Sequence, residues 1–205
     1  MENTSKTNEF SMAGWLAIAA ATLTLPMFAL SIGLDIVAKR EPEMISALLP
    51  PYLLVVVCHT VFSIYAFLKF RTLLNHRHDF HDVDRLMTVI VAGIIIITLI
   101  AVPVRLLNTL GDIGLPIILG FFAFLFVAGV IMGTISIIFA LRLLHLESDL
   151  NGFLKPYAYL TIAAAACFAL FITAPLGMII DAIANIVLAM IFLRPRTEPA
   201  QPDFV

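Results

Sequence analysis

Charged residues are scarce in this 205-residue chain, and no long hydrophilic segment occurs in it. Only 13% of the residues are Asp, Glu, Lys or Arg, whereas 61% are hydrophobic and the mean hydropathy is +1.05. A water-soluble domain usually has about 25% charged residues. The composition therefore excludes a soluble globular domain and predicts that lipid surrounds most of the chain.

Cysteine is nearly absent, and the sequence patterns that mark common enzymes are missing. Cys58 and Cys167 both lie inside apolar runs, so they make no disulfide framework, although their similar predicted depth leaves one disulfide open as an alternative. The chain contains no nucleophile elbow, phosphate-binding loop, HExxH or CxxC motif. These absences favour a non-enzymatic protein, and we expect no nucleic-acid partner.

The chain has instead a series of apolar runs that are long enough to cross a bilayer. A hydrocarbon core of about 30 Å takes roughly 20 residues of α-helix, which satisfies its own backbone hydrogen bonds. The stretch 156–193 would reach about 57 Å as one helix, so we expect it to fold back at 173–177, where Pro175 and Gly177 offer a stop and a tight turn. The sequence therefore predicts an all-α polytopic membrane bundle of six transmembrane helices in three hairpins, at about 12–37, 50–72, 85–108, 113–146, 156–174 and 176–194.

Lysine and arginine are distributed unevenly between the two sides of this six-helix arrangement. Nine of the twelve fall in the tails and in the second and fourth connections: Lys6, Lys69, Arg71, Arg77, Arg85, Arg142, Lys155, Arg194 and Arg196. Because positive charge is retained in the cytoplasm, this bias predicts cytoplasmic tails at 1–11 and 195–205, on either side of a transmembrane domain at 12–194. We expect a multi-pass protein of the cell inner membrane, with the lipid bilayer as its first partner.

Few polar residues lie within the predicted spans, and these occupy the outer half. Asp181 and Arg105 each come out about 8 Å below an outer helix end at a rise of ~1.5 Å per residue. We expect them to pair, because an acid in hydrocarbon usually faces the bundle interior and finds a partner. Asn185 shares a helix face with Asp181 and could extend the network toward His59. Asp35 lies near the outer end of the first helix and completes this candidate cluster.

Two interpretations of the cluster stay open. Asp181 could be a proton or cation site, with Arg105 as its counter-charge and His59 as a titratable relay. Alternatively, Asp181 and Arg105 form a structural ion pair, and His59 is a core histidine with a satisfied hydrogen bond. No cofactor is predicted, because His145 lies roughly 20 Å from His59 along the membrane normal, too far for a bis-histidine haem.

The second connection is rich in histidine and aspartate. It contains His76, His78, Asp79, His81, Asp82 and Asp84. Imidazole and carboxylate groups suit zinc or iron, so the three histidines are candidate metal ligands. Their spacing matches no known zinc pattern, however, and we favour a solvated loop in which Asp82 or Asp84 caps the third helix.

The fourth helix carries Gly129 and Gly133, whose spacing allows two backbones to approach closely in lipid. This glycine face could pack inside the bundle or drive formation of a homo-oligomer. The sequence thus predicts an accessory or protective membrane protein that acts through helix-face contacts with a membrane-protein partner or with itself. A small transporter or channel that uses the polar cluster is the alternative.

Overall fold

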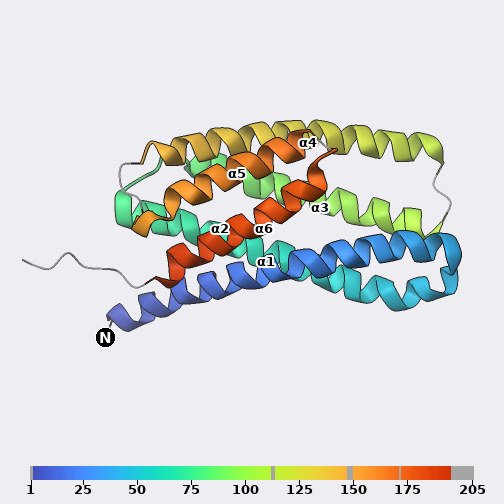
Figure 1. Ribbon diagram of the computed structural model, residues 1–205, viewed down its shortest axis with the longest axis horizontal. Helices are drawn as coiled ribbons and strands as arrows, with labels where there is room; N and C mark the ends of the chain where they lie inside the picture. Colours follow the sequence, from blue (N-terminus) through green and yellow to red (C-terminus); the bar gives the residue numbers. More distant parts are fainter. Residues whose placement is uncertain (1, 112–113, 147–149, 171, 195–205) are drawn as a thin grey trace, which may run out of the picture.

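The protein is all-α in the computed structural model, which describes residues 2–111, 114–146, 150–170 and 172–194, with the backbone alone for residues 2–9, 42, 77, 78, 110 and 151. Within these ranges there are six α-helices and no strand, so the predicted fold class is confirmed. The helices are α1 (Glu2–Arg40), α2 (Ile45–His78), α3 (Asp84–Leu110), α4 (Leu115–Leu144), α5 (Leu154–Ala169) and α6 (Ala174–Leu193), with 3-10 turns at Pro42–Met44 and Leu150–Gly152 (Figure 1).

Five helices are long and apolar enough to cross a membrane, namely α1, α2, α3, α4 and α6. These helices are compatible with an integral membrane protein. Helix α5 is apolar but has only 16 residues, which corresponds to about 24 Å, and it ends before the predicted 156–174 span does.

The chain reverses before Pro175 and Gly177: the described turn residues are Leu170, Ile172 and Thr173, so only Thr173 of the predicted break at 173–177 belongs to the turn. Pro175 lies in the first turn of α6, where a missing N–H costs no helical hydrogen bond. Gly177 serves close packing: a methyl group placed on it would lie 3.2 Å from the carbonyl oxygen of Ala164 in α5. The prediction that these residues form the turn is therefore wrong, although the two helices do form a hairpin.

The predicted N-terminal tail also differs from the structure. Helix α1 begins at Glu2, so residues 2–11 of the expected short tail are helical. The predicted tail at 195–205 lies outside the described residues.

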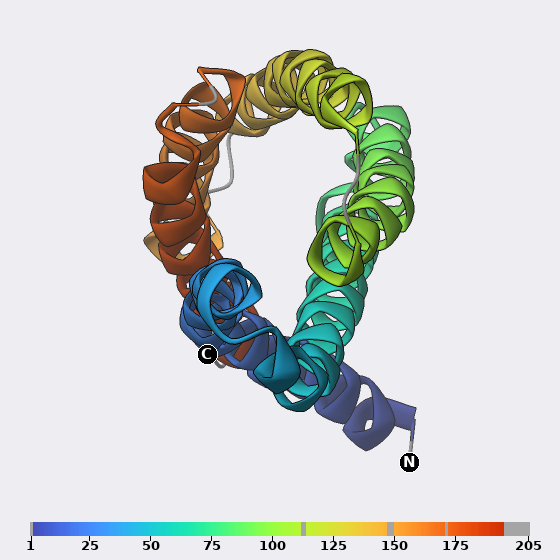
Figure 2. The same cartoon turned by 90° about the vertical axis from the view of Figure 1, so that its right-hand side faces the viewer.

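The six helices follow one another around a ring (Figure 2). Each helix packs against its two neighbours in sequence, and α1 closes the ring by packing against α6. The start of α1, the α2–α3 and α4–α5 connections and the end of α6 lie together, at what we call the proximal end (Figure 1). The α1–α2, α3–α4 and α5–α6 connections face the opposite, distal end.

The proximal half holds the main apolar core. Its largest fully buried side chains are Phe70, Leu73, Leu74, Met87, Phe139, Leu143, Leu154, Leu188 and Ile191, which come from α2 to α6. Helix α1 adds small residues such as Ala13 and Ala17. All six helices therefore contribute to one packed centre in this half.

The glycine face of α4 packs against α5 of the same chain. A methyl group placed on Gly133 would lie 2.8 Å from the carbonyl oxygen of Ala165, and one on Gly129 would lie 3.0 Å from the carbonyl oxygen of Phe168. The backbones of the two helices approach closely here, as the spacing predicts. This face is covered inside the chain and is not available to a second copy.

The α5–α6 hairpin does not reach the distal end (Figure 1). Gly129 lies beside Phe168, almost at the end of α5, whereas α4 extends about 21 Å farther, to Leu115, at ~1.5 Å per residue. The distal half consequently contains α1, α2, α3 and α4 alone. A small second core of Leu34, Tyr52 and Val56 joins α1 to α2 there.

Candidate functional site

A cavity of about 410 Å³ lies between α1, α2, α3 and α4 in the distal half. Its apolar lining consists of Met27, Val56, Ile97, Ala101, Val102, Val104, Ile118, Phe121, Phe122 and Leu125, and its polar lining of Asp35, Tyr52, Thr98, Arg105 and Asn108. Among the described residues, none from α5 or α6 lines it. The volume lies within the range of about 300–1,000 Å³ that is typical of small-molecule sites.

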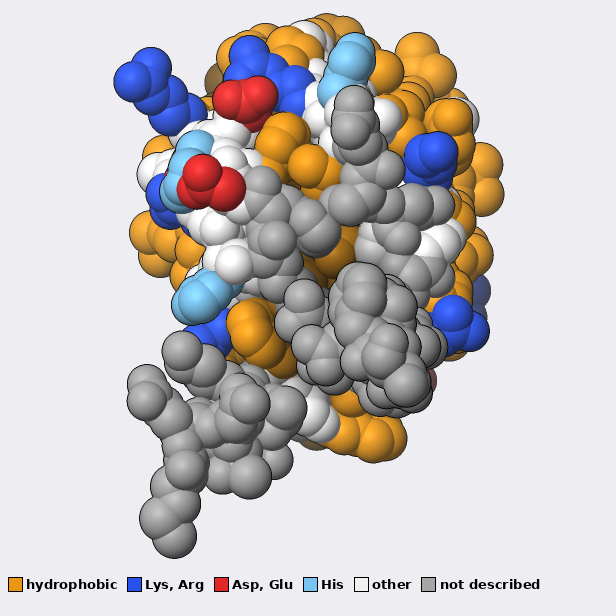
Figure 3. Space-filling model, turned by 90° about the vertical axis from the view of Figure 1, so that its left-hand side faces the viewer, with side chains coloured by type: hydrophobic (Ala, Val, Ile, Leu, Met, Phe, Trp, Pro, Cys, Tyr) orange, Lys and Arg blue, Asp and Glu red, His pale blue; other side chains and the backbone are white. Residues whose placement is uncertain are grey.

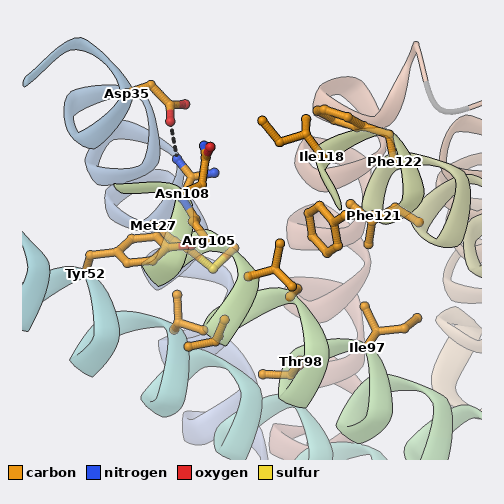
Figure 4. Close-up of a pocket in the computed structure, with 15 residues that line it drawn as sticks. Met27, Asp35, Tyr52, Ile97, Thr98, Arg105, Asn108, Ile118, Phe121 and Phe122 are labelled. Atoms are coloured by element: carbon orange, nitrogen blue, oxygen red, sulfur yellow. Dashed lines mark hydrogen bonds and ion pairs between the residues drawn. The ribbon is translucent and has the colours of Figure 1, made fainter. Parts of the chain in front are cut away.

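The lining follows from helical spacing on α3 and α4. Residues 97, 101, 104 and 108 recur every three or four positions and so share one face of α3, and residues 118, 121 and 125 do the same on α4. Figure 4 shows the aromatic side chains of α4 on one side of the cavity and the polar side chains of α1 and α3 on the other. The cavity is therefore amphipathic: Asp35, Arg105 and Asn108 lie together at one end, and Thr98 lies about two turns of α3 away from them.

Arg105 connects three helices at this polar end. Its Nη2 donates to Oδ1 of Asp35 at 2.9 Å and to the carbonyl oxygen of Ser31 at 2.7 Å, both on α1 (Figure 4). The guanidinium carbon lies 5.5 Å from the centre of the Tyr52 ring on α2, a cation-π distance. The Nε atom of Arg105 is buried and has no hydrogen-bond partner among the described residues.

The two charged partners differ in exposure. The Arg105 side chain is 27% exposed, whereas that of Asp35 is 57% exposed. Asn108 lies three residues after Arg105 and therefore on the same side of α3, and its side chain is next to the guanidinium in Figure 4. The polar end thus offers an accessible carboxylate, a guanidinium with an unused donor and a side-chain amide.

The predicted pair between Arg105 and Asp181 is not formed, because the partner of Arg105 is Asp35. Arg105 lies in the distal half, which α6 with Asp181 does not enter. In addition, α3 packs between α2 and α4, whereas α6 packs between α5 and α1, so the two residues lie on helices that are not neighbours. The depth of a residue along its helix does not determine where that helix lies in the ring.

Asp181 interacts within its own helix. Its Oδ2 accepts a hydrogen bond from Nδ2 of Asn185 at 3.2 Å, which matches the expected one-turn spacing. In the part of the chain that the structure describes, Asp181 forms no ion pair, and it does not line the distal cavity.

His59 belongs to a third, separate contact. Its Nε2 lies 3.3 Å from Oγ1 of Thr24 on α1, and that hydroxyl donates to the carbonyl oxygen of Ala20. Because the Thr24 proton is used in this way, the hydroxyl can accept from Nε2–H. The contact supports a satisfied core histidine and gives no connection toward Asn185.

Asp84 organises the polar residues of the proximal end. This first residue of α3 accepts hydrogen bonds from Nε of Arg71 at 2.8 Å, from Nδ2 of Asn75 at 3.0 Å and from Nδ1 of His81 at 3.1 Å. His81 also contacts Asp79 through Nε2 at 3.2 Å. The hydrogen bond to Asp84, together with the weaker one to Asp79, raises the pKa of His81 above its usual value. Asp84 therefore links α3 to α2 and to the α2–α3 connection.

The described histidines of this connection are not grouped as a metal site would require. No group of three or more His, Cys, Asp or Glu side chains is arranged to hold a metal ion among the described residues. His76 is exposed and His81 is engaged by carboxylates, while the side chain of His78 lies outside the described part. The expected cap is also different, since α3 begins after Val83 without a side-chain cap.

Positive side chains gather at the proximal end. Figure 3, which views this end, shows blue and pale blue side chains distributed among orange apolar ones. Among them, Arg142 of α4 donates from Nη1 to the carbonyl oxygen of Asp82 at 2.7 Å, and the guanidinium of Arg194 lies 4.6 Å from the Phe153 ring. These contacts hold the proximal connections against the helices.

Sequence reasoning did not identify Asn108, Thr24 or Tyr52 as members of a site. Asn108 could have been found from its spacing to Arg105. Thr24 carries no such signal, because its contact with His59 depends on how α1 and α2 pack together.

No protein-family model, curated protein or solved structure matches this chain. The distal cavity is therefore the feature of this chain that points to a function.

Proposed function

We propose that this chain is a multi-helix inner-membrane protein with both termini in the cytoplasm, which binds the apolar part of an amphipathic, lipid-like molecule in its distal cavity without catalysing a reaction. The observation that carries this proposal is the cavity itself, whose walls are largely apolar and whose two charged side chains lie at one end. Sites for small amphipathic ligands commonly combine apolar walls with a few placed polar groups.

The position of the cavity relative to a bilayer supports this function. A core about 30 Å thick corresponds to about 20 helical residues. Counted from Arg85 at the proximal end, that length reaches Arg105, and counted from Trp15 it reaches Asp35. The ion pair then lies at the headgroup level of the distal leaflet, and the apolar lining near Ala101 lies at the level of the acyl chains.

The unequal helix lengths support access from the bilayer. Because α5 and α6 end before the distal half, they do not cover the side of the cavity that faces them in the ring. A ligand from the distal leaflet can enter between α4 and α1 without crossing the packed proximal core.

The other hypotheses find less support. Self-association through Gly129 and Gly133 has no free surface, since α5 covers that face. A proton or cation relay through Asp181, Arg105 and His59 lacks continuity, since these residues belong to three separate contacts.

Photo-crosslinking tests the proposal. The purified protein is incubated with a phospholipid that carries a diazirine in one acyl chain, irradiated and mapped by mass spectrometry. We expect labelling of the α3 and α4 segments that line the cavity. Ala101→Phe fills the cavity and should reduce this labelling at least about fivefold, the factor that corresponds to ~1 kcal/mol.

The matched control is Ala123→Phe, on the exposed surface of α4 outside the cavity lining. It adds the same side chain and should leave the labelling unchanged. Labelling spread evenly over the apolar exterior, and equal in both variants, would refute the proposed function. The topology is tested separately: alkaline phosphatase fused after Val205 should be inactive, whereas a cytoplasmic reporter at the same position should be active.

A further inference from the structure

The polar end of the distal cavity presents both signs of charge side by side. Arg105 and Asp35 are the only charged residues of the described lining, and their side chains meet at 2.9 Å. The lining is therefore electrically neutral overall, but strongly dipolar over a few ångströms.

A polar end with both charges should bind some classes of lipid headgroup more tightly than others. A purely anionic headgroup that approaches Arg105 also meets the carboxylate of Asp35, which is 57% exposed and repels it. An uncharged headgroup leaves both charges with the interactions they already have. A headgroup with an anionic and a cationic group can bind both residues at once, since opposite charges attract strongly at the edge of a low-dielectric region.

The unused hydrogen-bonding capacity of the two residues fits such a headgroup. Arg105 has five N–H donors, of which Nη2 serves both Asp35 and Ser31, while Nη1 donates to no other described residue. Asn108 adds an amide beside it. Asp35 uses Oδ1 for Arg105, so its second oxygen is available to a cation.

We infer that the ligand is a zwitterionic phospholipid of the distal leaflet. One acyl chain occupies the apolar cavity, the phosphate binds the guanidinium of Arg105 and the amide of Asn108, and the ammonium group binds the carboxylate of Asp35. The cavity of about 410 Å³ is near the lower end of ligand-site volumes, so the second acyl chain stays in the surrounding bilayer. This inference rests on the proposed function, and it adds the class of headgroup.

The test compares three lipids with identical acyl chains: phosphatidylethanolamine, phosphatidylglycerol and diacylglycerol. Binding to the detergent-purified full-length protein is measured by native mass spectrometry. We expect phosphatidylethanolamine to bind about fivefold more tightly than phosphatidylglycerol, and diacylglycerol to bind most weakly. Asp35→Asn should abolish the preference for phosphatidylethanolamine by relieving the repulsion of phosphatidylglycerol.

Two further variants complete the design. Arg105→Lys keeps the positive charge without the planar fork, and it should weaken binding of both phospholipids while the protein stays folded. Glu41→Gln removes an exposed carboxylate that does not line the cavity, and it should leave the preference intact.

The outcomes separate this inference from the proposed function. Equal binding of the two phospholipids, or a preference that survives Asp35→Asn, overturns the zwitterion proposal alone, provided that Ala101→Phe still blocks binding of both. If Ala101→Phe blocks neither phospholipid, the cavity is not the binding site and both proposals fail.

Discussion

Gly133→Ala is the most direct test of how closely α4 and α5 pack. The added methyl group would lie 2.8 Å from the carbonyl oxygen of Ala165 and 3.1 Å from the Cβ atom of Ala169. The first of these is a backbone atom, so a side-chain rotation cannot relieve the contact. The two helices must separate, or α5 must shift along its axis.

The expected magnitude combines two opposing effects. Overpacking of a tight contact costs about 1–3 kcal/mol. Replacement of glycine by alanine inside a helix contributes about 1 kcal/mol in the other direction, because alanine has the higher helix propensity. We therefore expect a net loss of up to about 2 kcal/mol in the free energy of unfolding.

Gly120→Ala is the matched control on the same helix. A methyl group at this position would have no atom within 4 Å, so only the propensity effect remains and the protein should become slightly more stable. The measurement is thermal unfolding of both variants in the same detergent, followed by size-exclusion chromatography. If Gly133→Ala raised the midpoint as much as Gly120→Ala, the close approach of α4 and α5 would be disproved.

Three further predictions concern polar contacts. The ion pair should show a coupling energy of up to about 1 kcal/mol in a double-mutant cycle of Arg105→Leu and Asp35→Leu, and additive effects on the midpoint would contradict a direct contact. Thr24→Val removes the hydrogen-bond partner of the α2 histidine and should lower stability by about 1 kcal/mol, whereas Thr22→Val, at an exposed hydroxyl bonded only within its own helix, should change stability little. Because the folded-state pKa of His81 is raised above 6.5, its contribution to stability should be complete below about pH 6.5 and fall as the pH rises through the folded-state value. A difference in midpoint between the wild type and His81→Gln that stays constant from pH 5 to 9 would refute this.

The charge-free runs were sufficient to predict the helices, since a backbone in hydrocarbon must satisfy its own hydrogen bonds. The contact between Asp181 and Asn185 was also predictable, because both residues lie on one helix and the spacing of four is fixed by helical geometry. The end of α5 was not predictable in this way. Leu170 is as apolar as the residues before it, so hydropathy gives no stop signal at Ala169.

The partner of Arg105 could not be predicted from the sequence, for a different reason. Its depth followed from its position in the chain, but the order of helices around the ring depends on which faces pack most closely. Gly129 and Gly133 illustrate this point, since their spacing predicts a close approach without naming the helix that approaches.

The sequence by itself determined that this protein is a bundle of apolar helices and that its positive charges favour one end, because hydropathy and charge act on each segment separately. Only the tertiary structure decided that Arg105 binds Asp35 and that a cavity lies beside them. The cavity exists because α5 and α6 end before α1 to α4 do, and a space between helices is a property of their relative lengths and packing. No single residue encodes it.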